Sequence, residues 1–183
     1  MKIGFDAKRY YHNQTGLGNY SRTIVGGLQK LFPENEYVLY DEGSLSRAFS
    51  LGKKAAKDGC DIFHGLSNEI PFDLNSRQRP ASIVTIHDVA WLTFPDMYHW
   101  ADRKIYNWKY GSSCRRADKV LAISESTKND VIRFYGVKEE NVKVIYQPVQ
   151  EYYYTPLADD ICDKLITEHF GKEGLPPFIL YVG

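Results

Sequence analysis

The chain has 183 residues, of which 43% are hydrophobic and 25% charged, as is typical of a globular protein with one sizeable core. Lys and Arg together number 23, and so do Asp and Glu, so no net field favours nucleic acid or an acidic partner. The first residues lack the apolar stretch of a signal peptide, and no apolar run is long enough to span a bilayer.

The number and spacing of the cysteines indicate the redox state of the cellular compartment. Cys60, Cys114 and Cys162 are far apart and form no CxxC pair, so neither a disulfide framework nor a zinc knuckle is indicated. A reducing compartment fits this usage best. We therefore expect a cytoplasmic protein that binds no nucleic acid.

The first part of the chain predicts strand, helix and strand. Residues 2–6 form a strand that ends on a carboxylate, and a polar loop over residues 9–19 follows it. Apolar side chains at helical spacing then predict a helix over residues 20–32, which Pro33 ends. Residues 37–40 are the second strand, and a weakly patterned helix covers residues 44–58.

The middle of the chain holds its most informative strand. Residues 61–64 predict a short third strand, and residues 82–86 a buried fourth strand that stops on His87 and Asp88. A loop rich in aromatic residues follows, and then a helix over residues 101–117.

The remaining elements complete an alternating pattern. Residues 119–123 form a fifth strand, Ser124 is the predicted N-cap of the next helix with Gly136 as its left-handed stop, and residues 141–146 form a sixth strand. Alternating strands and helices predict an α/β protein with a doubly wound, mainly parallel sheet.

The character of the chain changes at residue 147. Prolines and three consecutive tyrosines indicate an irregular connector, and a helix with an apolar face from Ile161 to Phe170 follows, stopped by Gly171. The last residues, 178–183, read as a strand with nothing behind it. That arrangement is typical of the start of a further domain.

Three polar motifs follow predicted parallel strands. They are residues 16–19, His87 with Asp88, and Ser124 with Glu125. Because ligands bind outside the carboxyl ends of the strands in such sheets, we expect all three motifs to line one edge. Each also has a plain structural interpretation: a tight turn with positive φ, a hydrogen-bonded loop histidine and a helix cap.

Metal binding has little support in the sequence. His12 and His64 have no partner at metal-binding spacing, and both are interpreted as loop histidines. No cluster of carboxylates or cysteines suggests a metal site elsewhere.

Six short motifs occur in order along the chain and together carry a family resemblance. They lie at residues 3–7, 15–20, 84–88, 116–120, 122–127 and 178–183. This ordered set resembles family 4 glycosyltransferases, which are retaining, nucleotide-sugar-dependent enzymes of the GT-B fold. In that fold two Rossmann-like domains face each other across a cleft, and the first mainly binds the acceptor.

The resemblance implies a domain organisation. Residues 1–147 would be a Rossmann-like acceptor-side domain, residues 148–177 a linker and helix, and residues 178–183 the first strand of a missing carboxy-terminal, donor-binding domain. The chain would then be truncated or be half of a split enzyme, and we favour truncation. Such a half would be inactive by itself, because donor positioning and leaving-group stabilisation need both sides of the cleft.

The resemblance also implies roles for individual residues. His87, the catalytic candidate, would face the transferred sugar, bonding a hydroxyl or supporting the charged transition state. Gly16, Leu17 and Gly18 would lie near the donor diphosphate. The candidates for acceptor binding are Arg9, Tyr10, Asn19, Asp88, Ser124 and Glu125.

Partners follow from the same resemblance. The donor would be a nucleotide sugar acting as co-substrate, with no other cofactor and no metal, and the acceptor a glycan or a lipid-linked molecule. A lipid-linked acceptor would bring the enzyme into peripheral contact with the cytoplasmic face of the inner membrane. One departure concerns the turn after the sixth strand, where residues 147–150 read Gln-Pro-Val-Gln instead of an Asn-Gly-Val-Asp-like turn. Acceptor or interdomain contacts made by that turn are therefore open.

Two alternatives remain at this point. A stand-alone Rossmann-like module would bind a nucleotide or sugar without further sequence. Another GT-B enzyme, such as a phosphorylase or an epimerase, would share the cleft and would show phosphate-dependent cleavage or free-sugar turnover.

Overall fold

The computed structural model describes residues 1–74, 80–149, 154–171 and 179. The chain divides into two compact units, Met1–Pro148 and Val149–Gly183. In the second unit the described element is α8 (Asp159–Phe170), which ends at Gly171 with φ 65°, as the sequence predicts. The strand predicted over residues 178–183 lies outside the described residues, apart from Ile179.

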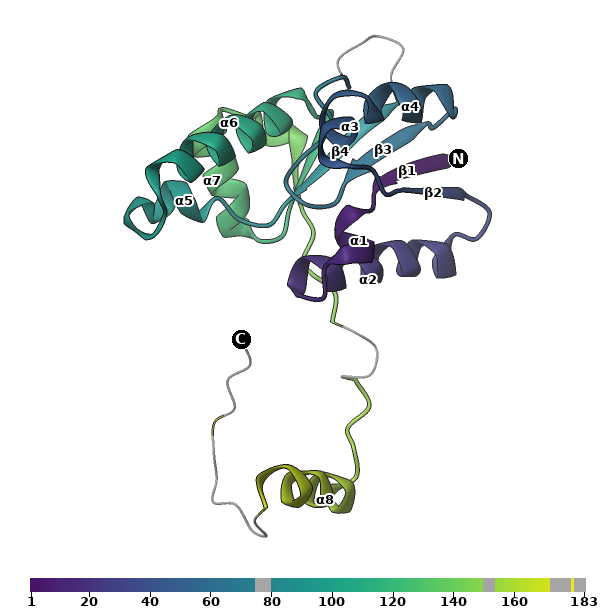
Figure 1. Cartoon of the computed structure of the whole chain (residues 1–183), viewed down its shortest axis with the longest axis vertical. Coiled ribbons are helices and arrows are strands. Elements are labelled where there is room, and N and C mark those ends of the chain that lie inside the picture. Colours follow the sequence, from purple (N-terminus) through teal and green to yellow (C-terminus); the bar gives the residue numbers. More distant parts are fainter. Residues whose placement is uncertain (75–79, 150–153, 172–178, 180–183) are drawn as a thin grey trace. The chain divides into compact units, whose positions relative to one another are not determined.

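The first unit is built on a six-stranded sheet in the order β2-β1-β3-β4-β5-β6, with every pair parallel. The strands are β1 (Lys2–Asp6), β2 (Glu36–Tyr40), β3 (Ile62–Gly65), β4 (Ala81–Ile86), β5 (Lys119–Ala122) and β6 (Val142–Val144). The chain direction across the sheet reverses at β1, which lies between β2 and β3 (Figure 1). A crevice at the carboxyl ends of β1 and β3 is the expected ligand position in such a sheet.

Helices connect the strands. They are α1 (Lys8–His12), α2 (Gly16–Leu31), α3 (Ser44–Phe49), α4 (Leu51–Lys57), α5 (Ala90–Thr93), α6 (Trp100–Arg116) and α7 (Glu125–Tyr135), with 3-10 turns η1 (Pro95–Met97) and η2 (Glu139–Asn141). Three local predictions were wrong. Part of the loop expected over residues 9–19 is α1 and the start of α2, the helix expected over residues 44–58 breaks at Ser50, and the loop after β4 contains α5.

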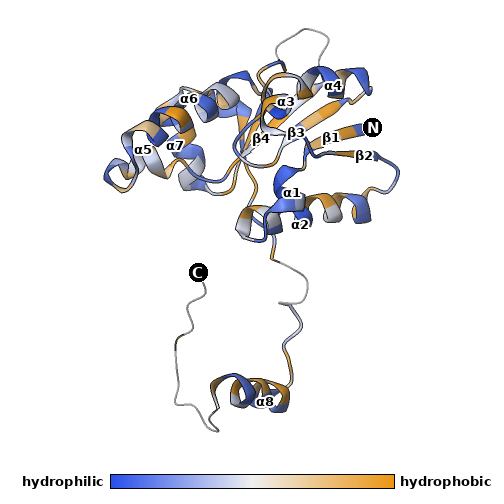
Figure 2. Cartoon of the chain, in the orientation of Figure 1, coloured by the Kyte–Doolittle hydropathy of each residue, from blue (hydrophilic) through white to orange (hydrophobic). Residues whose placement is uncertain are grey.

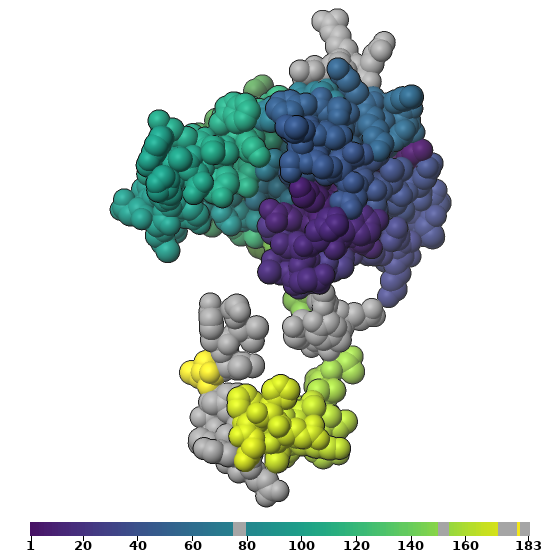
Figure 3. All heavy atoms as spheres, in the orientation of Figure 1, coloured from purple at the N-terminus to yellow at the C-terminus, as the bar shows by residue number. Residues whose placement is uncertain are grey.

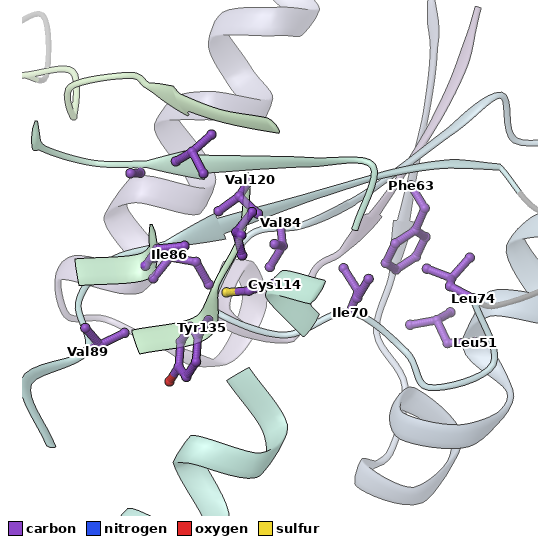
Figure 4. Close-up of a cluster of buried hydrophobic side chains, with 14 of the residues drawn as sticks. Leu51, Phe63, Ile70, Leu74, Val84, Ile86, Val89, Cys114, Val120 and Tyr135 are labelled. Atoms are coloured by element: carbon purple, nitrogen blue, oxygen red, sulfur yellow. The ribbon is translucent and has the colours of Figure 1, made fainter. Parts of the chain in front are cut away.

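The main core lies on one face of the sheet. Helices α4, α6 and α7 contribute Leu51, Cys114 and Val131, which are almost fully buried against strand residues such as Phe63 and Val84. Figure 4 shows Leu51, Cys114, Phe63 and Val84 among the buried side chains of this core. Hydropathy colouring shows the apolar character of the strands (Figure 2). Burial of each such side chain contributes about 1.5–3 kcal/mol, and the sum fixes the positions of the strand ends.

A smaller core lies on the other face, under α2. Tyr20 and Val25 of α2 pack with Phe5 of β1 and Leu66 of the loop after β3. Beside α2 the same face carries an apolar groove of about 510 Å³. Its lining includes Leu28 on α2 together with side chains of β1, β3, β4 and β5. This face is therefore covered less completely than the opposite one.

Two polar contacts connect α1 to α3 and to the segment just before it. Lys8 Nζ donates to Ser44 Oγ at 3.1 Å, and His12 Nε2 lies 2.8 Å from Asp41 Oδ2. The space-filling view shows the purple amino-terminal residues lying against the blue residues of this region (Figure 3). His12, expected in a loop, is the last residue of α1.

Candidate functional site

His87 is the first residue after β4, and its main chain is bonded to two other parts of the fold. Its backbone N–H donates to Asn68 Oδ1 at 2.8 Å, and its carbonyl accepts from Thr127 Oγ1 at 3.2 Å. Asn68 belongs to the loop after β3, and Thr127 to the first turn of α7. The predicted strand therefore ends where two separate segments hold the next residue in place.

The His87 ring is enclosed on three sides. Its Nε2 lies 3.0 Å from the Leu66 carbonyl oxygen, and its Nδ1 lies 3.0 Å from Gln147 Nε2. Tyr20 approaches edge-on, with ring centroids 4.7 Å apart and an interplanar angle of 87°. Only 6% of the residue is exposed. Burial lowers the pKa of His87, while the Leu66 carbonyl and the Asp88 carboxylate oppose that effect.

A buried polar relay lies beneath this ring. Thr85 Oγ1 is 3.0 Å from the Tyr20 hydroxyl and 2.8 Å from His64 Nε2. Burial lowers the pKa of His64 to about 4, and His87 adds to the effect. His64, expected in a loop, is thus a neutral core residue of β3 that anchors α2 through Thr85 and Tyr20.

The loop after β3 has little freedom. Asn68 has a φ of 65°, which asparagine adopts more readily than most residues, and its N–H donates to the Thr85 carbonyl at 2.8 Å. A Cβ on Gly65 would lie 2.0 Å from the Glu69 carbonyl oxygen. Both constraints fix the Leu66 carbonyl and the Asn68 amide that hold His87.

The glycine motif forms the first turn of α2. The expected tight turn with positive φ is wrong, since neither Gly16 nor Gly18 has a positive φ. Gly18 is required for another reason: a Cβ there would lie 1.7 Å from the Asn13 carbonyl oxygen. The Asn13 side chain also organises the turn, because its Oδ1 accepts from the N–H groups of Thr15 and Gly18.

The backbone N–H groups of this turn differ in whether they have a hydrogen-bond acceptor. Gly18 N–H is bonded to Asn13, whereas the N–H groups of Gly16 and Leu17 donate to no atom in the part of the chain that the structure describes. A Cβ on Gly16 would meet nothing within 4 Å, so packing does not explain a glycine there. Two open amides at a helix amino terminus are suited to bind an anion.

The amino-terminal acceptor candidates lie on α1 and α2. Arg9 is exposed, whereas Tyr10 is half-buried and packs against the smaller core. Asn19 is exposed, and its Oδ1 accepts from Arg22 Nη2 at 2.7 Å. Arg9 and Asn19 therefore present polar groups to solvent, and Tyr10 has a structural contact as well.

The other acceptor candidates follow β4 and β5. Asp88 is exposed, and its Oδ1 accepts from the Ala90 N–H at the start of α5. Ser124 caps α7, since its Oγ accepts from the Thr127 N–H at 3.1 Å. Glu125 is exposed. Among the described residues, none of these six candidates hydrogen-bonds the His87 ring.

An ion cluster in which Asp6 is buried and the other members are partly exposed lies at the carboxyl end of β1. Asp6 is 4% exposed and pairs with Arg47 of α3, which also lies 3.6 Å from Glu69. Lys109 of α6 reaches the same glutamate at 3.5 Å. Burial raises the pKa of Asp6, and Arg47 opposes that effect. This cluster joins α3 and α6 to the loop after β3.

Several contacts of His87 were not predicted. From the sequence, Tyr20 is only the first residue of a predicted helix, Asn68 has no assigned role, and Gln147 is only a departure from a family pattern. The signal available in the sequence was Gly65 and Asn68 in the segment after the third strand, because glycine and asparagine favour turns. The spatial pairing itself has no signature in local sequence.

The described residues hold neither a grouped set of metal ligands nor a membrane-spanning helix. Within residues 1–74, 80–149 and 154–171, no three His, Cys, Asp or Glu side chains are grouped so that they could hold a metal ion. Over the same residues, no helix combines the length and the apolar character needed to cross a bilayer.

This chain is similar to a family model and to several solved structures. A family model described as Glycosyltransferase Family 4 matches residues 17–151. The chain is similar to Alr3699/HepE of Anabaena in complex with UDP-glucose, with a TM-score of 0.60, 17% identity, and coverage of 93% of this chain and 50% of that one. The complex of the same protein with UDP and glucose gives a TM-score of 0.58 and 18% identity at the same coverage. The comparison with curated proteins gave no match.

The similarity to solved structures gives information on the fold of this chain. The chain spans about half the length of the solved structures it matches, since it covers 50% of each. At this identity the similarity concerns the fold alone, and it confirms the predicted class: a doubly wound, parallel, Rossmann-like sheet that corresponds to one half of a GT-B fold.

Proposed function

Because the chain belongs to glycosyltransferase family 4, we propose that it is the acceptor-binding half of a retaining enzyme that transfers a hexose from a nucleotide sugar. The observation that carries the proposal is the position of His87. It lies at the carboxyl edge of the sheet, where Tyr20 of α2, Thr127 of α7 and Gln147 after β6 all contact it. Ligands bind at this edge in doubly wound sheets.

The donor diphosphate would lie at the amino terminus of α2. The open amides of Gly16 and Leu17 support this position, since the helix dipole and unpaired N–H groups favour negative charge. A Cβ on Gly16 would meet nothing within 4 Å, so a glycine at this position leaves space for close approach of a phosphate. There the amides would stabilise charge that develops on the leaving group. HepE in complex with UDP-glucose supports a nucleotide sugar as donor.

The acceptor would bind among the exposed polar groups at the same edge. Arg9, Asn19, Asp88 and Glu125 are exposed there, and Ser124 is partly so. We propose a glycan or a lipid-linked acceptor, as in polysaccharide biosynthesis, and no metal or other cofactor. For a lipid-linked acceptor, we propose that the enzyme works in the cytoplasm in peripheral contact with the membrane.

The proposal includes inactivity of this half alone. The nucleotide would be held by a second domain, so the open amides of α2 would form only one side of its site. Positioning of two reactants accounts for a large part of the rate of such reactions, and one half cannot supply it.

The test has two arms. Calorimetric titration with UDP- and GDP-sugars is carried out on the 183-residue chain and on a protein that also carries a donor-binding half. We expect binding to the longer protein only. Tight binding to the 183-residue chain would instead indicate a self-sufficient nucleotide-binding module.

The second arm addresses His87. In the longer protein, His87→Ala should reduce transfer by about 10²-fold or more, because it removes a group that contacts the reacting sugar. His99→Ala is the matched control, since His99 precedes α6 and does not touch the site. Near-native turnover of His87→Ala would contradict the role of His87.

A further inference from the structure

The hydrogen bonds of the His87 ring define its protonation state. A carbonyl oxygen only accepts hydrogen bonds, so the contact with the Leu66 carbonyl requires a proton on His87 Nε2. In a neutral ring Nδ1 is then an acceptor, and the Gln147 amide N–H faces it at 3.0 Å. Both ring nitrogens are satisfied when the imidazole is neutral with its proton on Nε2.

The two partners of the ring differ in exposure. Leu66 is fully buried and lies in the loop that Gly65 and Asn68 hold in place. Gln147 is exposed and follows β6 in an irregular segment. The Nε2 side of the ring therefore faces the interior, whereas an exposed side chain covers the Nδ1 side. A ligand that reaches His87 would meet Nδ1 and Gln147 first.

We propose that the Leu66 carbonyl holds His87 as a neutral imidazole, and that Gln147 is the positioning residue that occupies Nδ1 in the free protein until a sugar hydroxyl donates to Nδ1 in its place. The hydroxyl takes the place of the Gln147 amide as donor, so one hydrogen bond replaces another. This inference rests on the proposed function and makes it more specific. His87 then acts as a hydrogen-bond acceptor and not as a cation or a proton donor.

The surroundings of the ring agree with a neutral state. The charged or titratable groups nearest to it are Asp88, which favours the cation, and His64, which lies below and is itself neutral. Tyr20 presents a ring edge, and its hydroxyl is bonded to Thr85. A doubly protonated ring would have a proton directed at the Gln147 amide N–H, which would have to turn away.

The test uses the tautomer and pKa of His87, measured by nitrogen NMR of the ¹⁵N-histidine-labelled 183-residue chain. In the wild type we expect a single Nε2–H tautomer at neutral pH. Gln147→Met keeps the length of the side chain and removes the donor, so the tautomer should persist while the Nδ1 resonance moves to that of a nitrogen in contact with water. Gln147→Glu places a carboxylate at Nδ1 and should raise the pKa of His87 by about 1–3.

Gln29→Glu is the matched control, because Gln29 is exposed near the carboxyl end of α2 and should leave His87 unchanged. A predominant Nδ1–H tautomer in the wild type would overturn the inference. An Nδ1 resonance that is the same in the wild type and in Gln147→Met would also overturn it.

A kinetic readout separates this inference from the proposed function. In the longer protein, Gln147→Glu should transfer sugar about tenfold more slowly than the wild type near pH 7 and should recover as the pH rises and His87 loses its proton. If His87→Ala is inactive while Gln147→Glu has a wild-type pH profile, the proposed function stands and the role of Gln147 is wrong. If the NMR results hold while His87→Ala is fully active, the proposed function is wrong.

Discussion

Two helices contact His87, α2 through Tyr20 and α7 through Thr127, and their first turns are built differently. In α7 the side chain of Ser124 accepts from the Thr127 N–H, so the helix caps itself. In α2 the N-cap residue Thr15 provides no such bond, and the amides of Gly16 and Leu17 meet no acceptor among the described residues. In both helices the first two N–H groups meet no described acceptor, and the third is bonded to a side chain, that of Asn13 in α2. The starts differ in charge: α7 carries the Glu125 carboxylate in its first turn, whereas α2 has no acidic residue there, which leaves its positive end for an anion.

The difference shows how to separate structural from functional glycines and serines at one edge of a sheet. Gly18 is required by the fold because the Asn13 carbonyl occupies the place of a side chain. Gly16 has open space around it. Substitutions in the two turns should therefore separate stability from binding.

Gly18→Ala should have the largest effect on stability. Its Cβ would lie 1.7 Å from the Asn13 carbonyl oxygen, so the start of α2 must move. We expect a loss of about 4 kcal/mol or more in the free energy of unfolding, measured by urea denaturation. Gly26→Ala is the control, because a Cβ there meets nothing within 4 Å and should stabilise α2 slightly. Equal denaturation midpoints for the two variants would contradict the steric argument.

Lowering the pH should have the next largest effect on the free energy of unfolding. The folded-state pKa of His64 is about 4, below its ordinary value of 6.5, so the unfolded chain takes up the proton first as the pH falls. Stability present above pH 6.5 is lost progressively towards pH 4, by about 3 kcal/mol from this group. Denaturation curves over this range measure it. His64→Gln, which does not titrate, should show a weaker pH dependence, and parallel curves would disprove the role of His64.

Ser124→Ala should have a smaller effect. It removes the cap of α7 and should cost about 1 kcal/mol in the free energy of unfolding. If Ser124 is only a cap, acceptor affinity in the longer protein should be unchanged. A loss of acceptor binding beyond the loss of stability would support its proposed place on the acceptor side.

Gly16→Ala should change stability least, by less than about 0.5 kcal/mol, because its Cβ would point into open space. In a protein that binds the nucleotide sugar, the same change should weaken donor affinity about tenfold or more, as measured by calorimetry. Unchanged donor affinity would remove the argument that the α2 amides bind the diphosphate.

Local patterns in the sequence predicted most of the framework. The β-branched run over residues 83–86 lies in β4 (Ala81–Ile86), and the Ser124 and Gly136 signals mark the ends of α7 as expected. These features depend on residues a few positions apart, which is why sequence alone reveals them. The parallel sense of the sheet follows from the alternation of strands and helices, whereas the order of its strands was not predicted.

The candidate site was only partly predictable. The position of His87 after β4 follows from the strand pattern, but its partner Gln147 is 60 residues away, and that pairing depends on the completed sheet. Helix α1 was missed because its five residues carry no buried side chain and hence no apolar periodicity. The need for Gly18 was also hidden, because the atom that it avoids belongs to the backbone of Asn13.

The apolar groove beside α2 has a practical consequence for handling the protein. A groove of about 510 Å³, lined by Leu28, Leu121 and Ile145 among others, is open to water in a chain whose formal net charge is zero at pH 7. Net charge therefore does not oppose contact between molecules through this groove at neutral pH. Samples should be easiest to concentrate at pH values well above 7, where the chain acquires negative charge and the His64 relay is intact.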